Sequence, residues 1–143
     1  MTVFLGIDYG AKRIGLAVGD TEMRLAAPLK TIAAASKIAD QVRAVLAAAA
    51  DYEVDALVVG LPLNMDGTEG DQAKLTRQFG SALAQATTKS VCYSDERLSS
   101  VTARELLQPA ELSRKGESRA ENAVAAQVML QAYLDNLSSE ADT

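Results

Sequence analysis

Two short apolar runs near the N-terminus have the composition of neighbouring β-strands. Residues 3–10 (VFLGIDYG) alternate and contain β-branched and aromatic side chains, and residues 14–18 (IGLAV) form a second run after a glycine-containing turn. Because only three residues separate the two runs, we expect them to pair as a hairpin. A third strand is expected over residues 25–32, either interrupted by Pro28 or placed at a sheet edge, because proline has no amide hydrogen to donate.

The rest of the chain alternates between helical and strand patterns. Apolar residues follow helical spacing from Ile38 to Leu46, with Ser36 as the expected N-cap. Strands are expected over residues 56–60 and 90–94. Between them, a helix is predicted to carry one apolar face, made of Leu75, Phe79, Ala82 and Leu83. A further helix is expected from Ser99 or Ser100 to Leu107, and then a mobile loop over residues 108–117.

The last helix has the clearest start signal. Ser118 and Glu121 fit a capping box, and the residues that then share one face are Asn122, Ala126, Leu130, Tyr133 and Leu137. The predicted order β-β-β-α-β-α-β-α-α indicates an α/β domain, with an antiparallel hairpin region and parallel crossover strands. We expect a single domain over residues 1–137 and an acidic, disordered tail over residues 138–143.

Composition narrows the chemistry that this domain can perform. The chain has 143 residues, a net charge of −5, one cysteine and no histidine. The single cysteine rules out an internal disulfide framework and favours a reducing cytoplasm, and no apolar run is long enough to span a membrane. Without histidine, catalysis must depend on carboxylates, lysine, tyrosine or a hard metal, for which Mg²⁺ or Mn²⁺ are the natural candidates. The negative charge argues against a generic nucleic-acid coat.

Asp8 is the most informative residue, because it interrupts an apolar strand. A buried carboxylate costs several kcal/mol unless a cation or a donor compensates it. The carboxyl ends of parallel strands meet at one sheet edge, where the loop after Asp8, the loop over residues 61–70, and Asp95 with Glu96 are expected to converge. Acidic groups gathered there could hold two divalent ions for phosphodiester cleavage.

The same residues also allow structural roles. Asp8 could accept turn amides or pair with Lys12 or Arg13, and residues 95–97 could form a solvated strand end. Asn64 and the residues after it could serve only the geometry of the turn. The sequence pattern alone does not decide between these roles and a metal site.

Four segments together resemble the YqgF family, the pre-16S rRNA nucleases that are also described as Holliday-junction-resolvase-like proteins. They are residues 6–18 (GIDYGAKRIGLAV), 58–70 (VVGLPLNMDGTEG), 95–100 (DERLSS) and 131–134 (QAYL), in the family's order and spacing. The resemblance implies a ribonuclease H-like three-layer fold, with a mixed five-stranded sheet flanked by helices. It also implies a cytoplasmic bacterial protein that trims the 5′ end of pre-16S rRNA.

The resemblance further implies a divalent-metal site, with Mg²⁺ or Mn²⁺ held by Asp8 and Glu96 and with Asp95 beside them. The family usually has an aspartate where this chain has Asn122, so the amide of Asn122 is expected to be a weaker, uncharged ligand. We expect Asp8, Glu96, Asp95 and Asn122 to form the catalytic group. The expected substrate-binding residues are Lys12, Arg13, Asn64 and Arg97.

Three other functions are compatible with these motifs. Because of Asn122 and the negative charge, the domain could bind RNA or a ribosome-assembly partner without cleaving it. A dimer could resolve branched DNA instead of cutting structured RNA. The segment from Asp8 to Gly15 also resembles the first phosphate motif of the actin and sugar-kinase superfamily, but those enzymes need two such domains. The oligomeric state is not determined by the sequence.

Overall fold

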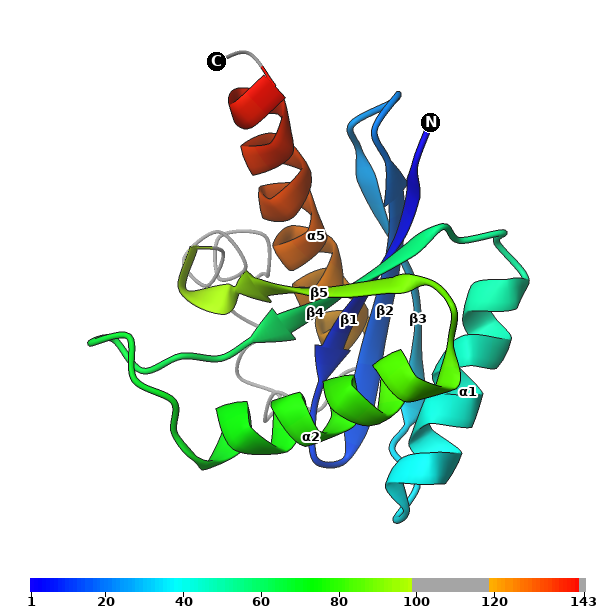
Figure 1. The fold of residues 1–143 in the computed structure, drawn as a ribbon, viewed down its shortest axis with the longest axis vertical. Coiled ribbons are helices and arrows are strands. Elements are labelled where there is room, and N and C mark those ends of the chain that lie inside the picture. The colour runs from blue at the N-terminus through cyan, green and yellow to red at the C-terminus, as the bar shows by residue number, and fades with distance from the viewer. Residues whose placement is uncertain (99–118, 142–143) are drawn as a thin grey trace.

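A computed structural model of the protein describes residues 1–98 and 119–141 (Figure 1). Five strands form one sheet in the order β3-β2-β1-β4-β5. Their bounds are β1 Val3–Tyr9, β2 Arg13–Asp20, β3 Ala26–Ala33, β4 Ala56–Leu61 and β5 Ser90–Asp95. Strands β1, β2 and β3 pair antiparallel, whereas β4 runs parallel to both β1 and β5. The predicted mixed five-stranded sheet with an antiparallel hairpin region is confirmed.

The edge position of β3 agrees with the expectation from Pro28. The pairing of β3 with β2 shifts register between Leu16 and Ala17, where Ala17 lies opposite Pro28 and Leu16 opposite Lys30. Leu29 is therefore the extra residue of a β-bulge. A proline is tolerated here because an edge strand needs ladder hydrogen bonds on one side only.

In the described part of the chain, the helices lie on both faces of the sheet and form three layers with it (Figure 1). Helices α1 (Ile38–Ala50) and α2 (Asp71–Ala86) cover one face of the sheet, and α5 (Arg119–Ala141) crosses the other. The first face buries side chains that include Ile7, Val45 and Phe79. The second buries Phe4, Val58 and Leu130, among others. No helix in the described part of the chain is both long and apolar enough to cross a bilayer.

Two local predictions in the helices are wrong. The N-cap of α1 is Lys37 and not Ser36, and no side chain caps the helix. Instead, Gln41 Nε2 donates to the Ala35 carbonyl at 2.6 Å, so a local hydrogen bond from a side chain inside the helix fixes the chain before it. In α2, Leu75 is 46% exposed while Thr76 is fully buried. Thr76 can be buried because its hydroxyl donates to the Gln72 carbonyl at 2.8 Å.

The C-terminal helix α5 continues to Ala141 and so extends past residue 137, where the sequence predicts the end of the domain. Residues 142–143 lie outside the described part. So do the helix expected near residues 99–107, the loop expected over residues 108–117 and Ser118 of the capping box. The side chain of Glu121 is not described either. Single-domain organisation over residues 1–137 therefore stays a prediction.

Candidate active site

The carboxyl ends of β1, β4 and β5 lie at the same edge of the sheet because the three strands are parallel. Asp8 is the penultimate residue of β1, and Glu96 begins a single 3₁₀ turn, Glu96–Leu98, directly after β5. The strand between them is β4, so the Glu96 side chain must cross β4 to reach Asp8. The two carboxyl groups do meet, and they hydrogen-bond to each other.

Gly60 in β4 makes this crossing possible. A Cβ atom at residue 60 would overlap with Oε1 of Glu96 and lie 3.0 Å from its Cγ and Cδ atoms. The Glu96 side chain therefore rests on the bare backbone of Gly60. Any larger residue at this position would push the carboxyl group away from Asp8.

The contact between the two acids changes their ionisation. Burial raises the pKa of Asp8, and the hydrogen bond with Glu96 opposes part of that rise. The pKa of Glu96 rises to about 9, first because of burial and then because of the negative charge of Asp8 and the hydrogen bond with it. Two carboxylates in contact repel each other unless a proton or a cation lies between them. The pair therefore retains one shared proton near neutral pH.

These oxygen donors fit a hard divalent cation, which would replace the shared proton and neutralise both acids. Within the described residues, however, no group of three or more acidic, histidine or cysteine side chains gathers at one point. Within this part of the chain, the site is built on two carboxylates, and a third ligand from the same described residues must be another type of donor.

Asn122 lies in the first turn of α5, where the backbone of the helix passes close to β2. A Cβ at residue 15 would overlap with the carbonyl oxygen of Asn122, so α5 approaches β2 closely only because residue 15 is glycine. Gly15 is the cross-strand partner of Asp8. The backbone of Asn122 therefore lies beside the residue that pairs with Asp8, and the Asn122 side chain is half-buried there. This placement suits a third oxygen donor.

Asp95 turns away from the pair. Its carboxylate accepts hydrogen bonds from Arg97 Nε, at 3.1 and 3.0 Å, and from Arg97 Nη2 at 2.6 Å. The Arg97 guanidinium lowers the pKa of Asp95, so this carboxylate stays charged. Of the two neighbouring acids, Glu96 therefore contacts Asp8 and Asp95 pairs with Arg97.

The predicted substrate-binding residues differ in their exposure and in their hydrogen-bond partners. Lys12 is exposed in the β1–β2 turn. Arg13 is half-buried at the start of β2, and strand alternation with Gly15 puts it on the α5 face. Asn64 instead serves its own turn, because its Nδ2 donates to Thr68 Oγ1 at 3.0 Å. Arg97 is held by Asp95 and by the carbonyl oxygens of Asn64 and Met65.

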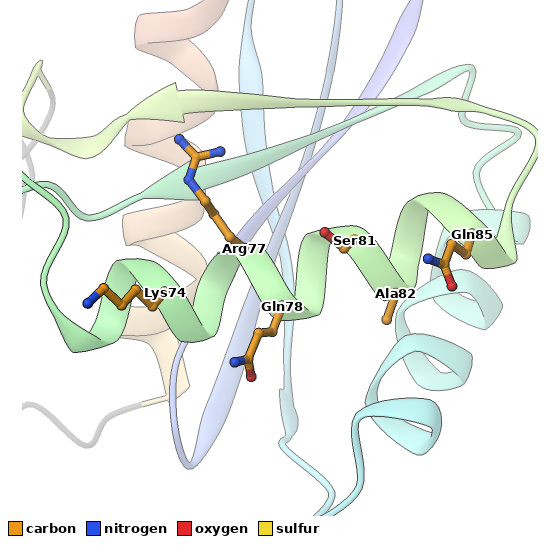
Figure 2. A pocket seen from close by; sticks show the side chains of 6 residues that line it. All are labelled: Lys74, Arg77, Gln78, Ser81, Ala82 and Gln85. Carbon is orange, nitrogen blue, oxygen red and sulfur yellow. The ribbon is translucent and has the colours of Figure 1, made fainter.

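A hollow on the outer side of α2 is not part of this site. Its lining residues are Lys74, Arg77, Gln78, Ser81, Ala82 and Gln85, and Figure 2 shows them along that helix. Since α2 covers the face opposite α5, the sheet separates this hollow from Asp8 and Glu96. Most of its lining belongs to the solvated side of an amphipathic helix.

Sequence reasoning missed the glycines that shape the site and the bonds that hold the end of β1. Tyr9 hydroxyl donates to Gln41 Oε1 at 2.7 Å, its ring stacks on Phe79, and Gln72 Nε2 donates to the Tyr9 carbonyl at 3.1 Å. Both helices α1 and α2 thus fix the residue after Asp8. Gly15 and Gly60 stand inside strand patterns, where a glycine signals close approach of another group, and that signal could have identified them.

Comparison with solved structures defines the class of fold. The chain is similar to RuvC of T. thermophilus in complex with a Holliday junction substrate, with a TM-score of 0.59, 16% identity and 97% of each chain covered. A second T. thermophilus RuvC structure gives a TM-score of 0.55 at 17% identity, over 90% of this chain and 92% of the other. At this identity the likeness concerns the fold alone, which is ribonuclease H-like.

Comparison of sequences identifies the family. Residues 2–136 match the family described as "RuvX: Holliday junction resolvase", and the chain belongs to this family. A relative from Anaeromyxobacter sp. (strain K), named "Putative pre-16S rRNA nuclease", is 45% identical over 131 residues, which are 92% of this chain and 95% of the relative. A relative of the same name from Methylocella silvestris is 40% identical over 133 residues, 93% of this chain and 82% of the relative. The resemblance to the YqgF family is thereby confirmed.

Proposed function

We propose that this protein is a divalent-metal-dependent nuclease that processes the 5′ end of pre-16S rRNA during ribosome biogenesis in the cytoplasm. The observation that carries the proposal is the contact between Asp8 and Glu96 across Gly60 at the carboxyl edge of the sheet. The family and the names of relatives at 40–45% identity support a nuclease acting on this RNA. Nucleases of the resolvase and ribonuclease H-like class generally depend on divalent metal ions.

In this proposal Asp8 and Glu96 bind Mg²⁺ or Mn²⁺, and Asn122 contributes an amide oxygen. A bound divalent ion supplies activation of water and neutralises charge on the phosphodiester group. Lys12 and Arg13, beside the turn after β1, hold substrate phosphates by charge. Asp95 does not bind the ion itself in this proposal, because its carboxylate pairs with Arg97. It supports the catalytic group by holding the residues next to it.

The direct test is titration with Mn²⁺ and with Mg²⁺ in a calorimeter, comparing the natural chain with Asp8→Asn. We expect binding to the natural chain and at least a tenfold loss of affinity in the variant, because one of two charged ligands is removed. Asp51→Asn is the matched control, because Asp51 is an exposed aspartate at the end of α1. This control should bind like the natural chain.

Cleavage should then be measured on RNA that spans the 5′ precursor of 16S rRNA, with a four-way DNA junction of similar length beside it. We expect metal-dependent cleavage of the RNA, and none by Asp8→Asn or Glu96→Gln. Cleavage of the junction alone would replace the RNA proposal with a DNA resolvase. If the natural chain binds RNA but cleaves neither substrate, the protein is a binding module.

The variant Asn122→Asp tests the third ligand. A carboxylate beside Asp8 and Glu96 would add one charge to the donor set, so we expect tighter Mn²⁺ binding, by about tenfold, and faster cleavage. An unchanged affinity together with unchanged cleavage would place Asn122 outside the metal site. Asn136→Asp, at an exposed position of the same helix, is the matched control.

A further inference from the structure

Residues 61–70, which we call the arm, form a structured projection after β4 (Figure 1). Leu63 and Glu69 form an isolated antiparallel bridge, and the Asn64 amide donates to the Thr68 carbonyl at 2.9 Å. Asp66 Oδ1 accepts from the Thr68 amide at 3.0 Å and from its hydroxyl at 2.6 Å. The arm is therefore a small hydrogen-bonded hairpin and not an irregular loop.

Two arginines hold the two limbs of the arm. On the first limb, Arg97 Nη1 donates to the carbonyl oxygens of Met65 at 3.2 Å and of Asn64 at 3.5 Å. On the second limb, Arg77 Nε donates to Glu69 Oε1 at 2.7 Å, and the Arg77 guanidinium lies 5.0 Å above the Tyr93 ring. Figure 2 shows Arg77 extending from α2 toward the sheet.

The first of these contacts is connected to the active site. Asp95 Oδ1 accepts a hydrogen bond from the Arg97 backbone amide at 2.9 Å, so Asp95 caps the single turn that contains Glu96. The same carboxylate holds the Arg97 guanidinium, whose other nitrogen binds the arm. In the sheet, Asp95 lies opposite Leu61, where the arm begins. Glu96 thus stands between the two residues that tie the arm to β5.

We propose that Asp95 and Arg97 form a latch that fixes the arm and the backbone of Glu96 relative to each other. Both are then positioning residues of the candidate active site. This deepens the proposed function, on which its relevance to catalysis rests, but the latch itself is a property of the folded protein without metal or substrate.

The latch and a phosphate contact require different chemical groups at residue 97. Nε and both Nη atoms of Arg97 each have a protein acceptor. Only the planar fork of a guanidinium can reach a carboxylate and two carbonyl oxygens at once, whereas a lysine can still hold a phosphate. The substitution Arg97→Lys therefore separates the two roles.

Amide hydrogen exchange of the metal-free protein tests the latch. The amide of Arg97 donates to Asp95, and the amide of Gly67 donates to the Asn64 carbonyl at 2.8 Å, which Arg97 also holds. In Arg97→Lys and in Arg97→Gln, we expect both amides to exchange about tenfold faster or more, since the contacts that fix their acceptors are lost. Amides in β1 and β4 should keep their protection, which shows that the fold persists. Arg43→Gln, which breaks an exposed ion pair with Asp40 in α1, should change none of these rates.

Mn²⁺ titration extends the test to Glu96. Both Arg97 variants should bind Mn²⁺ about 10- to 100-fold more weakly, as is usual when a residue that orients a ligand is changed. Arg77→Gln should speed exchange in the arm but leave Mn²⁺ affinity unchanged, because Arg77 does not contact the turn of Glu96. If the natural chain binds no Mn²⁺, the proposed function fails, and the exchange rates still decide on the latch.

The opposite pattern would overturn the proposal. If Arg97→Lys leaves both the amide exchange rates of the arm and the Mn²⁺ affinity as in the natural chain, Arg97 does not form a latch with Asp95. Should Arg97→Gln in addition weaken RNA binding with a smaller salt dependence, Arg97 would be the phosphate contact that the sequence predicted.

Discussion

At the scale of single residues, two carboxyl groups in contact determine how the protein responds to pH. Glu96 has a pKa of about 9 in the folded protein, against an ordinary value of 4.5. Between these values the unfolded chain has released this proton and the folded protein retains it. The free energy of unfolding therefore falls as pH rises from about 4.5 to 9.

Glu96→Gln should remove much of this decline. We expect the metal-free variant to be more stable than the natural chain at pH 8, by on the order of 1–3 kcal/mol, and similar to it near pH 4. Urea unfolding with a chelator at several pH values measures the difference. Glu22→Gln, which removes an exposed carboxyl group in the β2–β3 turn, should retain the natural decline. A Glu96→Gln variant that declines as steeply as the natural chain would contradict this assignment.

Gly60→Ala should damage the site more than the fold. The added Cβ meets the far end of the Glu96 side chain, which can swing away. We therefore expect the free energy of unfolding to change by less than about 1 kcal/mol, while Mn²⁺ affinity and cleavage are largely lost. Gly70→Ala is the matched control, because a Cβ there would lie 3.4 Å from Asn64 Oδ1, in ordinary contact. Tight Mn²⁺ binding by Gly60→Ala would mean that Glu96 is not a ligand.

At the scale of elements, the position of α5 depends on hydrogen bonds to an edge strand. Gln131 Oε1 accepts from the Ala26 amide at 2.9 Å, and its Nε2 donates to the Arg24 carbonyl at 2.9 Å. One turn earlier, Gln127 Nε2 donates to the Ala26 carbonyl at 3.1 Å. The two glutamines thus satisfy both outward backbone groups of Ala26 in β3. They also set the register of the helix that brings Asn122 to Gly15.

Gln131→Leu should therefore destabilise the protein by about 1–3 kcal/mol, because the partly buried Ala26 amide loses its acceptor. Thermal or urea unfolding measures this cost. Gln85→Leu in α2, where the side chain is exposed, should change stability by less than about 0.5 kcal/mol. Equal effects of the two substitutions would show that Gln131 does not anchor α5.

At the scale of the whole molecule, the parallel strands and the opposing helix concentrate charge at one edge of the sheet. Asp8 lies in β1 and Glu96 directly follows β5, two strands that β4 separates, and Asn122 comes from the helix that packs on one face of this sheet. The net charge of −5 does not show this, because it sums over the chain. Binding of a cation at this edge would couple directly to folding, since the unfolded chain does not bring Asp8 and Glu96 together.

Mn²⁺ should accordingly stabilise the folded protein. At a concentration one hundred times the dissociation constant, the gain is about 2.7 kcal/mol, which corresponds to a rise of several degrees in Tm. At a fixed Mn²⁺ concentration, the gain should be larger at pH 8 than at pH 6, because the ion competes with the shared proton, and it should be small in Asp8→Asn. A Tm that rises equally in both proteins would indicate binding elsewhere on the surface.

The sequence by itself determined the five strands, their succession with the helices along the chain and the antiparallel hairpin, because alternation, glycine turns and helical spacing are local properties. It also identified Asp8 as a buried acid that needs a partner, and the four motifs led to the family. It could not choose between Asp95 and Glu96, because neighbouring residues carry the same local signal. Only the tertiary structure decided this, since Gly60 admits Glu96 to Asp8 while Arg97 holds Asp95. Contacts across strands and between layers arise from folding, and no local pattern contains them.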